Sequence, residues 1–119
     1  DVDMSLQGKY LFIVSMDVEP GKEDLFNEVY DNEHVPYLLK VPGVTAVTRL
    51  ESEPLTMNLG GKQLNIIPEN EPKYTAIYEI SGPEILVSDA WTEAVERGRW
   101  SSEVRPFTTN RRHTLKRAI

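Results

Sequence analysis

The chain has 119 residues, a formal net charge of −6 and no cysteine. This length predicts one domain, over residues 1–119, that can bury a core without disulfides or a structural metal. The absence of cysteine excludes iron–sulfur clusters, thiolate zinc sites and a cysteine nucleophile. No apolar run approaches the roughly 20 residues that span a bilayer. We therefore expect a cytoplasmic protein with no membrane partner.

Charge is unevenly distributed along the chain. Residues 104–119 contain five basic side chains and no acidic one, which leaves a formal charge of −11 on residues 1–103. A basic tail can bind nucleic acid, but an acidic body repels phosphates. We therefore expect no nucleic-acid partner, and we expect the tail to pair with acidic residues of the same chain or of a second subunit.

The first half of the chain carries strand and helix signals in turn. Residues 9–18 (KYLFIVSMDV) are rich in aromatic and β-branched residues and predict a strand whose two faces are both largely apolar. Helical spacing follows over residues 22–34. Pro36 is expected to end or kink this helix, with a short continuation over residues 36–40. Residues 44–53 then alternate as a second strand.

The stretch of residues 54–72 is too long for a simple connection in a compact domain. Its centre, residues 55–59 and 62–67 around Gly60 and Gly61, has the pattern of a β-hairpin with a two-residue turn. We therefore expect an inserted β-hairpin near residues 54–72.

The remaining elements complete an α+β pattern. Residues 73–81 predict a third main strand, residues 81–98 a second helix with Ser88 as an alternative start, and residues 104–115 a polar edge strand. The order predicts a ferredoxin-like βαββαβ fold with an antiparallel sheet. Two helices on one face would leave an apolar second face exposed, so we expect a homodimer through sheet–sheet packing.

The run EHVPYLL at residues 33–39, followed by VPGV at 41–44 and then Arg49, resembles the end of the first helix in the dimeric α/β-barrel superfamily, particularly in EthD-like proteins. The resemblance implies that the sheets of two protomers pair into a dimeric α/β barrel, with a ligand cavity between sheet and helices. The superfamily includes cofactor-free monooxygenases, isomerases, polyketide cyclases and haem-degrading enzymes, and fold alone does not choose among them. Whether the insert covers the pocket or swaps onto the partner stays open.

His34 is the candidate catalytic residue, because an imidazole titrates near neutrality. The resemblance implies an active histidine at this helix end. Regular helical spacing places His34 at the edge of an apolar arc that is centred near Glu33. A structural alternative is that His34 caps the helix C-terminus. A carboxylate at the centre of that arc must be paired or have a raised pKa.

Other residues are candidates for binding a substrate beside Glu33. Arg49 and Glu79 lie on adjacent strands and could pair with one another or polarise a ligand. Tyr37 and Trp100 lie in helix-end or loop segments, where pocket walls occur. His113 lies near Arg111 on the last strand. The sequence contains no glycine-rich phosphate loop, nucleophile elbow or paired-histidine motif, so we expect no cofactor and no metal.

Two functions remain open. The first is a cofactor-free isomerase, lyase or monooxygenase that acts on a small cyclic or aromatic compound, with His34 as acid/base. The second is a non-catalytic small-molecule-binding or stress-response protein of the same fold. A cavity filled by Phe12, Tyr78 and Trp100 would favour the non-catalytic protein, whereas an open cavity that holds a ligand would favour an enzyme or a carrier.

Overall fold

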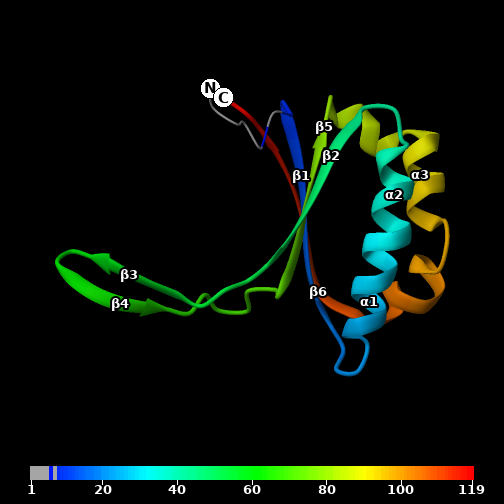
Figure 1. The fold of residues 1–119 in the computed structure, drawn as a ribbon. Coiled ribbons are helices and arrows are strands. Elements are labelled where there is room, and N and C mark those ends of the chain that lie inside the picture. The colour runs from blue at the N-terminus through cyan, green and yellow to red at the C-terminus, as the bar shows by residue number, and fades with distance from the viewer. Residues whose placement is uncertain (1–5, 7) are drawn as a thin grey trace.

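The computed structural model describes residue 6 and residues 8–119, and it shows an α+β fold (Figure 1). A four-stranded antiparallel sheet has the order β2-β5-β1-β6. Its strands are β1 (Tyr10–Val18), β2 (Val44–Glu51), β5 (Tyr74–Ile80) and β6 (Thr108–Arg117), and one face is covered by α1 (Glu23–Val29), α2 (Val35–Leu39) and α3 (Asp89–Glu96). The predicted α+β class and antiparallel sheet are confirmed, and the strand order is that of a ferredoxin-like chain.

The core lies between the sheet and its helices. Alternation along β5 turns Tyr74, Ala76, Tyr78 and Ile80 toward the helices, and all four side chains are buried. The helices contribute Phe26, Val29 and Leu38, among others, to the same cluster. Burial of each large apolar side chain stabilises the fold by about 1.5–3 kcal/mol. No helix in the described part of the chain combines the length and the apolar character that crossing a bilayer requires.

The first helix changes geometry before the proline and does not end there. A π-helical turn, η1 (Tyr30–His34), joins α1 to α2, and the N–H of Val35 donates to the carbonyl oxygen of Tyr30. A proline ring in a regular α-helix clashes with the carbonyl four residues before it. The wider turn relieves that clash. Pro36 therefore changes the pitch of the helical segment without ending it.

The inserted hairpin is confirmed as strands β3 (Leu55–Leu59) and β4 (Lys62–Ile66). Gly60 and Gly61 turn the chain between them with φ of 62° and 81°, a region that glycine enters without steric cost. The hairpin projects as an arm on the side of the sheet opposite to the helices (Figure 1). It raises the radius of gyration to 16.1 Å, against about 13.5 Å for a compact chain of this length. The arm therefore does not cover the helix layer of its own protomer.

The helix α3 and the last strand, β6, both begin later in the chain than the sequence predicts. A 3-10 segment, η2 (Pro83–Val87), precedes α3. The N-cap of α3 is Ser88, which is the alternative start that the sequence offers. The Ser88 hydroxyl accepts a hydrogen bond from the Trp91 N–H at 3.2 Å. A π-helical turn, η3 (Trp100–Val104), and a 3-10 turn, η4 (Arg105–Phe107), occupy the predicted start of the last strand. Pro106 lacks a ladder donor, so β6 begins only at Thr108.

Candidate functional site

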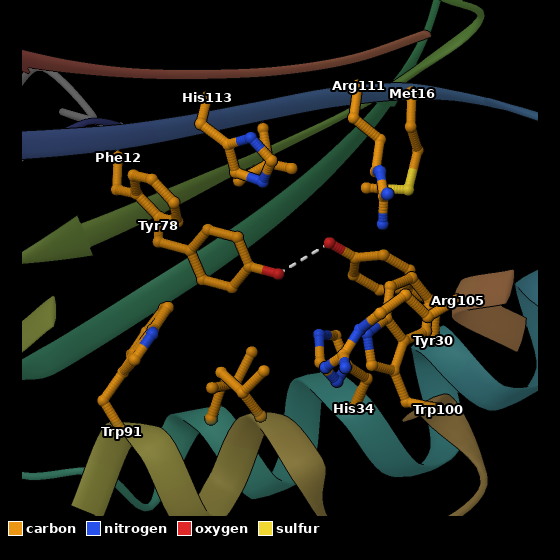
Figure 2. Close-up of a pocket in the computed structure, with 13 residues that line it drawn as sticks. Phe12, Met16, Tyr30, His34, Tyr78, Trp91, Trp100, Arg105, Arg111 and His113 are labelled. Atoms are coloured by element: carbon orange, nitrogen blue, oxygen red, sulfur yellow. Dashed lines mark hydrogen bonds between the residues drawn. The ribbon is translucent and has the colours of Figure 1, made fainter. Parts of the chain in front are cut away.

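A cavity of about 190 Å³ lies between the sheet and the helices. An apolar cavity of about 150 Å³ is known to hold benzene, so this space can take a substituted ring. Phe12, Tyr78 and Trp100 line the cavity and leave it open (Figure 2). The full lining comprises Phe12, Val14, Met16, Tyr30, His34, Leu38, Tyr78, Trp91, Val95, Trp100, Arg105, Arg111 and His113.

Two tyrosine hydroxyl groups meet across the cavity. Tyr30, from η1, and Tyr78, from β5, are joined by a buried hydrogen bond of 2.6 Å between their hydroxyl oxygens (Figure 2). Burial raises the pKa of Tyr30 to about 12 and also raises the pKa of Tyr78. Both phenols are therefore neutral at physiological pH. One proton serves the bond between them, so the other hydroxyl proton is available to a third group.

His34 lies in the wall of this cavity. Its side chain is buried, and its imidazole stacks on the Trp100 indole with 4.3 Å between ring centroids. The Nδ1 atom is buried and has no hydrogen-bond partner among the described residues. Because the helical segment continues into α2, the alternative that His34 caps a helix C-terminus is wrong.

The environment of His34 keeps its imidazole neutral. Burial, with a smaller contribution from the positive charge of Arg105, lowers the pKa of His34 to about 3, and Glu96 opposes this shift. The expectation of titration near neutrality therefore does not hold for the protein alone. A negative charge placed in the cavity would raise the pKa of His34 again, because it stabilises the imidazolium.

The π-helical turn explains why His34, and not Glu33, faces the cavity. Each residue of a π turn advances by a smaller angle than in an α-helix, so His34 rotates toward the core and Glu33 rotates away. The Glu33 carboxylate accepts hydrogen bonds from the Arg99 N–H at 2.9 Å and from Arg99 Nε at 2.7 Å, and these bonds lower the pKa of Glu33. The expected position of Glu33 at the centre of the apolar face is wrong, and its side chain holds the loop that precedes Trp100.

Arg49 and Glu79 lie on opposite faces of the sheet, so the expected pair between them does not form. Arg49 is opposite Ala76 on the helix-facing side, and its guanidinium lies 4.5 Å from the centroid of the Tyr30 ring. It donates hydrogen bonds to Asp31 and Asn27, each at 2.8 Å. Glu79 faces the other way and accepts from the Gly8 N–H at 2.7 Å. Arg49 thus supports the back of the Tyr30 ring without lining the cavity.

The structure brings three of the candidates together at the cavity: His34, Trp100 and His113. Tyr37 lies in a separate surface depression, where its ring is 5.6 Å from the Arg97 guanidinium. The sequence does not predict the Tyr30–Tyr78 pair. Alternation along each strand does place Tyr78 on the core face, but the contact depends on the π turn that carries Tyr30. No group of three metal-ligating side chains occurs in the described part of the chain.

The fold and cavity together define an α+β domain with an aromatic pocket between its sheet and its helices. One solved structure of similar fold is the crystal structure of an ethyl tert-butyl ether D (EthD) family protein from Bacillus halodurans C-125. The two share 13% sequence identity with a TM-score of 0.57, over 92% of this chain and 99% of that chain. No protein-family model matches the sequence, and no curated protein does. The chain therefore has an EthD-like fold, and at this identity the likeness concerns the fold alone.

Proposed function

We propose that the protein binds a small cyclic or aromatic compound in the sheet–helix cavity and that His34 moves a proton on it. The observation that carries this proposal is the imidazole of His34 in the wall of the open cavity, beside the Tyr30–Tyr78 pair. Because Nδ1 is enclosed, Nε2 is the ring nitrogen that a ligand in the cavity would meet. Trp100 and His113 would contact the ligand directly, since both line the cavity.

The chemistry that suits this arrangement is cofactor-free proton transfer next to a carbonyl group. Neutral His34 would accept a proton from the carbon beside the carbonyl, and the electron pair would move to the carbonyl oxygen. The free hydroxyl proton of the tyrosine pair would donate to that oxygen as negative charge develops there. Return of the proton to another carbon completes an isomerisation. The same charge raises the proton affinity of His34 at the moment when it is needed.

A non-catalytic binding protein is the second candidate. The lowered pKa of His34 favours it, because an imidazole with a pKa of about 3 is a weak base. In that case the imidazole of His34 would only form a hydrogen bond with the ligand. The two candidates share the ligand class and differ in whether a carbon-bound proton of the ligand exchanges with solvent.

A homodimer forms part of the proposal. The sheet face without helices carries Ile13, Ile77 and Leu50, and 46% of Leu50 is exposed. The β3–β4 arm projects from that same side (Figure 1). A second copy packed there, sheet against sheet as in a dimeric α/β barrel, would cover this face and meet the arm.

The experiment that tests the proposed chemistry follows exchange of carbon-bound protons. With 2-tetralone as the probe in D₂O, the wild-type protein is expected to accelerate α-proton exchange, measured by NMR, and H34F is expected to lose that acceleration. Quenching of tryptophan fluorescence reports binding separately. Binding without exchange supports the non-catalytic protein, and equal exchange by H34F contradicts a role for His34. Y37F, altered in the separate surface depression, serves as the control and is expected to keep the exchange.

A further inference from the structure

We propose that the cavity selects an anionic ring compound, whose carboxylate is held by Arg111 while its ring packs among the aromatic side chains. This rests on the proposed function and names its ligand class.

Arg111 is a charged group of the cavity that has no counter-ion among residues 6 and 8–119. Among the residues that the structure describes, the cavity lining contains two arginines and no carboxylate. Arg105 is neutralised by Glu96 through two hydrogen bonds of 3.1 and 2.7 Å. The exposed side chain of Arg111 makes no hydrogen bond or ion pair with any residue in the described part of the chain. The pocket therefore carries a positive charge that solvent, and no described carboxylate, balances.

The position of Arg111 is built into the strand by a β-bulge. Ser15 pairs with Arg112 and Asp17 pairs with Thr109, so both Asn110 and Arg111 stand opposite Met16. Asn110 has a φ of 51°, and its amide donates to Asp17 Oδ2 at 3.0 Å and to the Asn70 carbonyl at 2.9 Å. Bulges of this kind aim side chains and are common beside functional sites.

Figure 2 shows the Arg111 guanidinium beside Met16, directed toward the hydroxyl group of Tyr30. The guanidinium and the free hydroxyl proton of the tyrosine pair thus converge on one part of the cavity. A planar guanidinium binds a carboxylate through two parallel hydrogen bonds, which leaves the free hydroxyl proton of the tyrosine pair to the carbonyl oxygen of the same ligand.

The other end of the cavity suits a flat apolar ring. Trp91 meets Phe12 edge to face at 5.8 Å and Tyr78 at 5.6 Å between ring centroids. Such aromatic walls favour a ring by packing and by quadrupole geometry. An aromatic end and a cationic end within about 190 Å³ match a one- or two-ring carboxylate. A neutral ring of the same shape would leave Arg111 without a counter-ion.

The test compares two probes of nearly equal shape, 2-naphthoate and 2-naphthamide, by isothermal titration calorimetry with the full chain. Wild-type protein is expected to bind the carboxylate roughly tenfold to a hundredfold more tightly than the amide. R111Q is expected to bind both probes equally, close to the wild-type affinity for the amide. R117Q removes the same charge from the far end of β6, outside the cavity lining, and is expected to keep the preference.

Each other outcome counts against a stated part of the proposal. Equal binding of both probes to wild-type protein overturns the anion preference and leaves the proposed ring-binding function standing. A preference that survives in R111Q overturns the assignment of Arg111, and circular dichroism of R111Q confirms that the variant is folded. Failure of both probes to bind, by calorimetry and by tryptophan fluorescence, contradicts this inference and the proposed function together.

Discussion

The imidazole of His34 and the indole of Trp100 stack at 4.3 Å with 19° between their planes, and both residues belong to π-helical turns. The Tyr30 ring meets each of them edge to face, at 5.1 Å in both cases. Two wide turns, far apart in sequence, therefore place the rings that form one wall of the cavity. Such turns are rare and concentrate at functional sites, which agrees with the role that we propose for this wall.

Replacing the histidine should change how stability depends on pH. Because the pKa of His34 is lowered from its usual 6.5 to about 3, the unfolded chain binds one more proton than the folded chain between those values. Wild-type stability should fall as pH decreases below about 6.5, by up to about 1.4 kcal/mol per pH unit from this group. H34F should lack this contribution. Urea unfolding of both proteins at pH 7, 6 and 5 measures the difference in their free energies of unfolding. If the two free energies depended on pH in the same way, the buried, neutral state of His34 would be refuted.

The two tyrosine hydroxyl groups should be energetically coupled. Y30F or Y78F leaves the other buried hydroxyl without its partner at 2.6 Å, at a cost of about 1–3 kcal/mol. The double variant should cost less than the sum of the two single variants, by about 1 kcal/mol. Chemical unfolding of all four proteins gives the coupling. Strict additivity would show that the hydrogen bond contributes nothing to stability.

A methyl group at Gly98 should disturb the loop that positions Trp100. Gly98 has a φ of 74°, and a Cβ there would lie 2.6 Å from Glu33 Oε1 and 2.9 Å from Tyr37 Cε2. Gly21 has a similar φ of 86° and open space around it, so G21A is the matched control. Both variants should lose roughly 1–2 kcal/mol through backbone strain. G98A should lose more stability than G21A and should change tryptophan fluorescence. Equal losses of stability in the two variants would contradict the crowding of a Cβ at Gly98 by Glu33 and Tyr37.

The arm should contribute to dimerisation through one of its faces. Met57 and Leu64 stand opposite each other, 40% and 38% exposed, while Asn58 and Gln63 form the adjacent pair on the other face. An isolated two-stranded ribbon is only marginally stable, so we expect the apolar face to pack on the partner. M57S/L64S should weaken the dimer in light scattering, whereas N58S/Q63S should not. A wild-type monomer at micromolar concentration would contradict the proposed assembly.

Sequence patterns could predict the sheet, because strand alternation and the Gly60-Gly61 turn depend on local residue types. They could not place Glu33 and His34, since regular helical spacing assigns the inward position to the wrong one of the two. The bulge at Asn110 likewise makes regular alternation assign the wrong residues of β6 to the inward face. Strict alternation puts Thr109 on the same face of β6 as Arg111 and puts Thr108 on the opposite face. In the structure, however, Thr108 is the buried residue. Both errors arise where a single extra residue shifts the phase, and both shifts lie beside the cavity.

The central claim is that the cavity beside His34 is a ligand site. A crystal structure of the protein with 2-naphthoate tests it most directly. We predict the ring between Trp91 and His34, with its carboxylate within hydrogen-bond distance of Arg111. A cavity that stays empty at saturating 2-naphthoate, or a probe bound elsewhere on the protein, would contradict the account.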